Sequence, residues 1–462
     1  MLAARLPAGH SPSGDIRLTL VIMAWPVRLL RTSWLAGLAL LLAVPLWYSA
    51  GAVAGDSGVR RLAVLSGVLA ASVLVAATVL PSRLSYLNLA FGIERVLRYH
   101  RYAGLVAMTF VLVHVVAVLA EDTANLRLLD VTAAPPRARA AVGATAGMAV
   151  LCVLALLRRA RRRYTLWRLV HVVVALAVLT LSALHILWLD HLVRDAAARR
   201  VLAAMAGGLV LVLAYRWLWE PFAARTRPFV VEEVQHESPD TSTVVLTPKH
   251  SWQPGVRFAP GQFAWLRLDR PFSLHREHPF SIASAAHEHR RLQFTVREAG
   301  DFTRELRQLR PGRVVYLDGP HGSFSVDHHR TTGVVMICAG VGITPMISML
   351  RTLAHRGDRR RHLLVVSTRT PDDLLFRDEL EELRRRLHLD VIEVVSQPPR
   401  GWTGYAGRVD EYVLDEVLPR RGRADLRYFL CGPPAMVRRA SDALRRLSVP
   451  DHRIHTEQFD MA

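Results

Sequence analysis

Two patterns of apolar and polar positions divide the chain. Before about residue 220 the apolar residues form long runs, at about 33–50, 61–80, 102–120, 140–157, 168–188 and 200–219. A helix needs roughly 20 apolar residues to cross a bilayer. The first half is therefore predicted to be an α-helical membrane bundle of six spans, embedded in the lipid bilayer.

The second half has short β-like runs separated by glycine and proline, such as "FVVEEV", "STVVLTP" and "FAWLRL". These predict a small antiparallel β-barrel over 226–328. After "DHHRT", strands such as "GVVMICAG" and "HLLVVSTR" alternate with helical segments, which predicts a doubly wound α/β domain over 329–462. With a six-helix domain over 33–220 and an N-terminal segment over 1–32, this gives the expected domain organisation.

The charge of +20 has two readings. No Lys/Arg tract interleaved with aromatic residues appears on a soluble face, which argues against a nucleic-acid partner. The arginines gather instead beside the spans, in "GIERVLRYHR" and "RRARRRYTLWR", whereas "AEDTANLRLLD" is mixed or acidic. The positive-inside bias then predicts a multi-pass protein of the cell membrane, with its N-terminus and soluble half in the cytoplasm. Met23 is an alternative start, because "MAWPVRLLR" also reads as a basic flank.

Cysteines offer little chemistry. Cys152, Cys338 and Cys431 are far apart and form no CxxC pair. This spacing argues against zinc, an iron–sulfur cluster and a disulfide framework.

Ionisable residues inside membrane spans are costly and usually functional. The third and fifth spans each carry two histidines fourteen residues apart, His100 with His114 and His171 with His185. Fourteen residues return to within about 40° of the same helix face with a rise of about 21 Å. Because both spans run in the same direction, His100 is expected to face His171, and His114 to face His185. Two stacked bis-imidazole sites predict two b-type haems.

Haems accept single electrons whereas nicotinamides donate hydride, so a flavin is expected between them. In "HPFSIAS", Phe280, Ser281 and Ser284 lie beside a predicted strand and are candidate contacts to an isoalloxazine. In "GDFTREL", Gly300, Asp301 and Thr303 begin a predicted helix, where free amides suit a pyrophosphate. Turn formation alone is an alternative explanation for either motif.

The nicotinamide site is expected where strands of the α/β domain end. "CAGVGITPM" follows a buried strand, and Gly340 and Gly342 permit a close backbone approach at a helix start. Ser367 and Arg369 follow the next strand, where a basic residue suits the 2′-phosphate of NADPH. Asp372 and Asp373 would favour NADH if they faced the ribose, but they resemble a helix cap. NADPH is therefore expected over NADH.

The doubled histidine spacing, followed in order by "HPFSIAS", "GDFT", "DGPHGSF", "AGVGITP" and "CGPPAMV", resembles the ferric reductase and NADPH oxidase superfamily. The soluble half of that superfamily has a ferredoxin–NADP reductase-like fold. The resemblance implies FAD contacts from His278, Pro279, Phe280 and Ser281, with Thr303 at the pyrophosphate. For NADP it implies Gly340, Gly342, Ile343, Thr344 and Pro345, together with Cys431, Gly432 and Pro433. His321 replaces the family's usual aromatic, and Phe459 is a candidate for the aromatic residue that covers the flavin.

The expected function is a transmembrane NAD(P)H-dependent oxidoreductase. Electrons would pass from NADPH through FAD and two haems to a ferric chelate or oxygen on the outer face. Two alternatives remain. The chain would be an electron donor to an extracytoplasmic protein acceptor, or a non-enzymatic haem-binding sensor.

Overall fold

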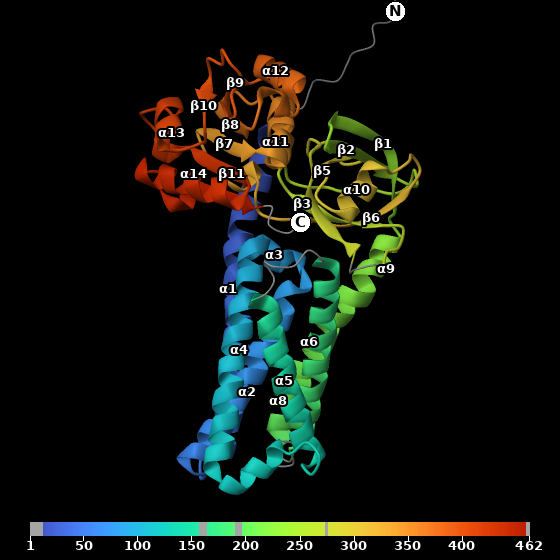
Figure 1. Cartoon of the computed structure of the whole chain (residues 1–462), viewed down its shortest axis with the longest axis vertical. Coiled ribbons are helices and arrows are strands. Elements are labelled where there is room, and N and C mark those ends of the chain that lie inside the picture. The colour runs from blue at the N-terminus through green and yellow to red at the C-terminus, as the bar shows by residue number, and fades with distance from the viewer. Residues whose placement is uncertain (1–12, 157–163, 190–195, 273–275, 459–462) are drawn as a thin grey trace, which may run out of the picture.

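The computed structural model describes residues 13–156, 164–189, 196–272 and 276–458 of the chain. A long helical bundle forms one end, and two sheet-containing domains sit side by side at the other end (Figure 1). Phe459, the candidate for the aromatic residue that covers the flavin, lies outside the described residues.

Among its described residues the bundle has six helices that are long and apolar enough to cross a membrane, which confirms the six predicted spans. Helix α1 begins at Ser13, inside the segment predicted to precede the first span. The last span continues from α8 through a short π-helical stretch at 215–219 into α9. The helices of this half are α1 Ser13–Ala52, α2 Gly58–Val79, α3 Ser85–Phe91, α4 Ile93–Glu121, α5 Pro136–Leu156, α6 Tyr164–Leu187, α8 Ala196–Ala214 and α9 Glu220–Arg225.

Exposed aromatic side chains mark both ends of the bundle. Trp47 and Tyr48 lie near the end of α1 and Trp188 directly follows α6, whereas Tyr86 lies on α3 and Tyr102 near the start of α4. Trp and Tyr rings are enriched at membrane–water interfaces because they have an apolar body and a polar tip. The apolar length between these two levels is the part of the bundle that fits a bilayer.

The first soluble domain is a six-stranded antiparallel sheet with the order β4-β3-β6-β1-β2-β5. One helix, α10 Asp301–Arg307, packs against β2 and β5. The hydrophobic core of this domain includes Leu246, Phe294 and Leu306, all fully buried. The strands are β1 Phe229–Ser238, β2 Thr241–Pro248, β3 Phe263–Leu268, β4 His278–Ser281, β5 Leu292–Arg297 and β6 Val314–His321.

The second soluble domain is a parallel sheet with the order β10-β9-β8-β7-β11-β12. Strand β7 is buried along almost its whole length, as expected for a parallel strand covered on both faces. Helices α11 and α12 pack on one face, and α13 and α14 on the other, so the predicted doubly wound fold is confirmed. The elements are β7 Gly333–Ala339, α11 Ile343–His355, β8 Arg361–Thr368, α12 Arg377–Arg386, β9 His388–Val395, β10 Tyr405–Ala406, α13 Glu411–Val417, β11 Arg427–Gly432, α14 Pro434–Arg446 and β12 Ile454–Gln458.

A buried ion network joins the bundle to the antiparallel sheet. The Glu277 carboxylate accepts from Arg83 at 2.7 Å, and from Arg168 and Arg216 at 2.6 Å each. Arg83 also bonds Asp318 on β6 at 3.1 Å. Burial favours the neutral acid, but the three guanidinium groups outweigh it and lower the pKa of Glu277 to about 2.

We predict that Glu277→Gln destabilises the junction by about 3–5 kcal/mol, because it leaves buried guanidinium groups without their counter-charge. The folded pKa of Glu277 lies below its ordinary value of 4.5. The stabilisation is therefore complete above that value and is lost as the pH falls toward about 2. Thermal unfolding of the detergent-solubilised protein measures the effect at neutral pH.

Glu305→Gln is the matched control, because its pair with Arg276 at 2.7 Å is largely exposed. Such a pair contributes at most about 1 kcal/mol. Equal shifts in melting temperature for the two variants would contradict the role given to Glu277.

Candidate functional site

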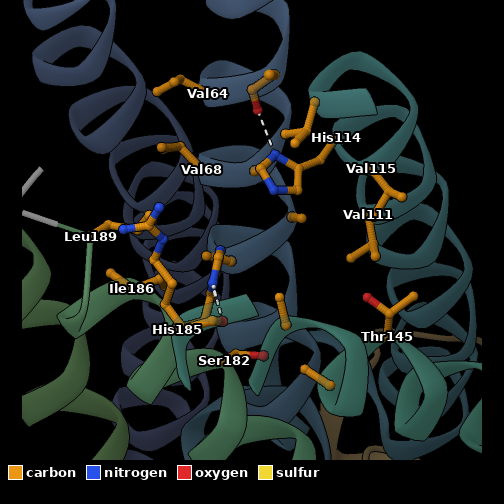
Figure 2. Close-up of a pocket in the computed structure, with 18 of the residues that line it drawn as sticks. Val64, Val68, Val111, His114, Val115, Thr145, Ser182, His185, Ile186 and Leu189 are labelled. Atoms are coloured by element: carbon orange, nitrogen blue, oxygen red, sulfur yellow. Dashed lines mark hydrogen bonds between the residues drawn. The ribbon is translucent and has the colours of Figure 1, made fainter. Parts of the chain in front are cut away.

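The far end of the bundle holds one facing pair of histidines. The ring centroids of His114 on α4 and His185 on α6 are 6.3 Å apart, with the ring planes at 71°. Both rings project into a cavity of about 1080 Å³ lined mainly by apolar residues of the bundle (Figure 2). Arg60, Arg137 and Asp122 also line this cavity.

A second pair lies at the end of the bundle nearer the soluble half. His100 on α4 and His171 on α6 have ring centroids 6.1 Å apart and ring planes at 74°. The structure thus brings together the four histidines in the two pairs that the spacing predicts. Fourteen residues of helix separate the two levels by about 21 Å.

Backbone hydrogen bonds orient three of the four rings. The Nδ1 of His114 donates to the Ala63 carbonyl at 2.7 Å, and that of His100 donates to the Ala77 carbonyl at 2.8 Å. His185 donates from Nδ1 to a carbonyl on α5 at 3.0 Å. A carbonyl only accepts, so each of these rings carries its proton on Nδ1 and keeps the Nε2 lone pair for a ligand.

The close approach of α2 to His114 requires a glycine. A Cβ built at Gly67 would lie 2.8 Å from His114 Nδ1, closer than side-chain contacts normally are. Gly67 therefore leaves room for the ring that an alanine would displace.

Both pairs fit a haem held by two imidazoles. A metal–imidazole bond is about 2 Å long, so two such bonds in line, with a ring radius of about 1 Å on each side, give about 6 Å between centroids. The observed 6.1 and 6.3 Å agree with this spacing. Nδ1–H bonds to carbonyls are also the usual way in which ligating histidines are oriented. The pairs are therefore suited to two haems.

The segment "HPFSIAS" at 278–284 is called the flavin stretch below. Aromatic rings of this stretch and of α10 form one surface. The ring of Phe302 stacks on His278 at 4.4 Å and on Phe280 at 6.1 Å. Burial, with Arg168 nearby, lowers the pKa of His278 to about 4, so this imidazole is neutral at physiological pH. Pro279, which lies between His278 and Phe280 in the sequence, is half-buried. A neutral, largely apolar surface of this kind suits a flat ring system.

The two serines of the stretch differ. Ser281 is buried, and its hydroxyl has no hydrogen-bond partner among the described residues. Ser284 accepts from the Gln293 amide at 3.3 Å, and its own carbonyl accepts from Ser348 on α11 at 2.8 Å. Ser281 is thus the hydroxyl suited to a ligand, whereas Ser284 joins the two soluble domains.

At the start of α10, Thr303 caps its own helix. Its hydroxyl accepts from the amides of Ala299 and Gly300 at 2.8 and 2.9 Å. The amide of Gly300 is therefore not free, in contrast to the prediction for this residue. Asp301 is fully exposed and bonds Arg304 at 3.3 Å.

In the α/β domain the ends of β7 and β11 meet. These strands pair in parallel up to Cys338 and Cys431, and Gly342 then lies against Cys431 and Gly432. A Cβ at Gly342 would lie 2.3 Å from the Cys431 carbonyl, so only glycine permits this contact. Ile343, Thr344 and Pro345 are buried at the start of α11, and Pro433 is exposed. The sheet order reverses between these strands, which is where such sheets bind nucleotides.

The ribose-recognition candidates lie at the end of β8. Ser367 ends the pairing of β8 with β7, and Arg369 is largely exposed two residues later. Asp373 accepts from the Thr370 amide at 2.9 Å and from its hydroxyl at 3.1 Å. That carboxylate caps a short helix and also pairs with Arg369 Nε at 3.9 Å, so Arg369 is the basic candidate for a phosphate and would exchange this exposed pair for it.

Sequence reasoning missed Phe302, Trp265 and Glu277. Trp265 is buried with Arg83 stacked at 3.4 Å from its ring centroid. Phe302 was present in "GDFT" and Glu277 directly precedes "HPFSIAS", so adjacency to a motif was the available signal.

Three family models match the chain in succession. A "Ferric reductase like transmembrane component" matches residues 66–182, an "FAD-binding domain" matches 228–324 and an "Oxidoreductase NAD-binding domain" matches 336–442. The first range contains His100, His114 and His171 and ends three residues before His185. The second contains the flavin stretch, and the third contains most of the β7–β11 site.

Relatives of known activity match part of the chain. NADH-cytochrome b5 reductase 1 of Cryptococcus neoformans is 31% identical over 162 residues, which are 33% of this chain and 55% of that protein. The chain thus spans about half the length of this relative. Ferredoxin–NADP reductase B of Sorangium cellulosum is 29% identical over 255 residues, 52% of this chain and 98% of that protein. The flavohaem-like FAD/NAD-binding domain of Vibrio cholerae nitric oxide dioxygenase is 25% identical over 50% of this chain and 98% of that domain, with a TM-score of 0.45.

We predict that Ser281→Ala weakens FAD binding by about 0.5–1.5 kcal/mol while leaving the stability of the FAD-free protein unchanged or slightly higher. The buried hydroxyl has no partner to lose when no ligand is present. Ser284→Ala is the control and should destabilise with or without FAD, because it deprives the Gln293 amide of its acceptor. Equal loss of stability in both FAD-free variants would contradict the assignment of Ser281.

Proposed function

Since the chain belongs to the ferric reductase and NADPH oxidase superfamily, we propose that it is an NAD(P)H-dependent oxidoreductase that moves electrons from NADPH through FAD and two b-type haems to an acceptor across the membrane. The acceptor is a ferric chelate or oxygen, and the soluble half lies in the cytoplasm.

The observation that supports this proposal most strongly is the stacking of two facing histidine pairs in one bundle, below a flavin domain. Each pair has the spacing of two axial ligands, at 6.1 and 6.3 Å between centroids. A sensor needs one such site. Two sites at different depths suit conduction across a membrane.

FAD would convert hydride donation by the nicotinamide into single-electron transfers, and the haem irons would carry those electrons through the bundle. Residues of this chain hold the flavin domain and the nearer histidine pair in position. His171 on α6 is preceded, one helical turn earlier, by Arg168, which bonds Glu277 at 2.6 Å. Glu277 directly precedes the flavin stretch. One short chain of contacts thus fixes the flavin domain relative to the nearer histidine pair.

The far cavity is the proposed place of the terminal step. It carries Glu121 and Asp122 beside Arg60 and Arg137, so both signs of charge are present. This lining is compatible with a chelated metal, whose charge is partly neutralised, and with oxygen. An extracytoplasmic protein acceptor remains the second candidate.

Purified protein given NADPH is the test, with haem absorbance, oxygen uptake and ferric-chelate reduction recorded together. The proposal expects haem reduction and consumption of one small acceptor. Reduced haem with neither acceptor consumed would favour the protein acceptor. Haem that stays oxidised would favour the sensor and overturn the proposal.

We predict that Gly67→Ala lowers the haem content from two per chain toward one. The new methyl group would meet the His114 ring, which is 2.8 Å from the Cβ position. Gly104→Ala on α4 is the control, because nothing lies within 4 Å of its Cβ position. A pyridine haemochrome assay reports both values, and two haems per chain in Gly67→Ala would contradict the proposed outer site.

We predict that Arg369→Glu weakens NADPH binding by about 1–3 kcal/mol, as expected for loss of a charged hydrogen-bond partner. NADH binding should change little, because NADH lacks the 2′-phosphate. The measurement is kcat/KM for both nucleotides in both proteins. An unchanged NADPH-to-NADH ratio in the variant would exclude Arg369 from the phosphate site.

A further inference from the structure

The four facing histidines are not held in the same way. Three of them donate Nδ1–H to a backbone carbonyl at 2.7–3.0 Å, namely His100, His114 and His185. His171 differs: its Nδ1 is buried and has no hydrogen-bond partner among the described residues. Some other contact must therefore fix the orientation of this ring.

That contact is an aromatic stack. Trp167 lies four residues earlier on α6, on the same helix face, and its indole stacks on the His171 ring at 5.3 Å and 23°. The indole is itself fixed, because its Nε1 donates to the Leu154 carbonyl on α5 at 2.9 Å. The α5 backbone thus reaches the imidazole through the tryptophan, whereas at the far level it bonds His185 directly.

We propose that Trp167 is the positioning residue of the inner haem site, holding His171 by stacking where the other three ligands are held by hydrogen bonds. This inference rests on the proposed haem function. A carbonyl bonded to Nδ1–H raises the basicity of a ligating imidazole, and a stacked indole does not. His171 is therefore the weakest of the four ligands and the one whose retention depends on a single side chain.

The test compares Trp167→Leu, which removes the ring, with Trp167→Phe, which keeps a ring but loses the indole N–H. In Trp167→Leu we expect one of the two haems to lose its six-coordinate low-spin spectrum and to bind carbon monoxide when reduced. The other haem and the FAD content should be unchanged, which shows that the chain is folded. Trp167→Phe should keep both haems low-spin.

Trp188→Leu is the matched control, since Trp188 follows His185 near the other end of the same span and is half exposed. It should leave both haems unchanged. Combining Trp167→Leu with His114→Ala assigns the effect, because the remaining haem should then be the one that binds carbon monoxide.

Two low-spin, carbon monoxide-insensitive haems in Trp167→Leu would overturn the inference. So would equal effects of the Leu and Phe substitutions, because the stack would then not be the cause, and so would an equal effect of Trp188→Leu. A wild-type protein without haem would instead refute the proposed function itself.

Discussion

The Glu277 carboxylate is the contact on which the relative placement of the two halves depends. It accepts from guanidinium groups that come from three parts of the bundle: Arg83 after α2, Arg168 on α6 and Arg216 after α8. One residue of the soluble half thus forms ion pairs with three separate segments of the bundle. Because the flavin stretch begins at the next residue, the flavin domain cannot shift without breaking these bonds.

Burying charged groups costs free energy, so each charged residue of this network stays buried only while its partners are present. Arg83 is 8% exposed, and burial lowers its pKa to about 10 despite the nearby carboxylates. It also adopts a left-handed backbone conformation, with φ of 59°, which a residue other than glycine keeps only when its surroundings demand it. Asp318 completes the network, and its pKa is held far below the ordinary range by His321 and the arginines despite burial. A network of this kind favours one docking geometry over a range of geometries.

The predicted secondary structure and topology were confirmed where a pattern of residues follows directly from helix or strand geometry. Apolar runs of bilayer length gave the six spans, and a spacing of fourteen residues placed His100 and His114 on one helix face. The alternation of buried strands and helices gave the doubly wound domain. The beginning of α1 at Ser13 was missed, because a polar start does not distinguish a helix extension from a flexible segment.

The roles of residues that depend on tertiary contacts could not be predicted from the sequence. Ser281 and Ser284 look equivalent in "HPFSIAS", yet only the structure shows that one hydroxyl lacks a partner and the other accepts from a backbone amide. The Thr303 hydroxyl accepts from the amide of Gly300, which the sequence analysis predicted to be free for a pyrophosphate. The Glu277 network joins residues up to 235 positions apart, which no local pattern reports.

We infer that electrons from NADPH reach two haems in the bundle through the flavin domain. Anaerobic mixing of the purified protein with NADPH, with flavin and haem absorbance followed in time and total haem counted, tests it most directly. If electrons follow this route, the protein holds two haems per chain, and both are reduced after the flavin begins to be reduced. A flavin that is reduced while the haem stays oxidised, or a chain that holds fewer than two haems, would contradict it.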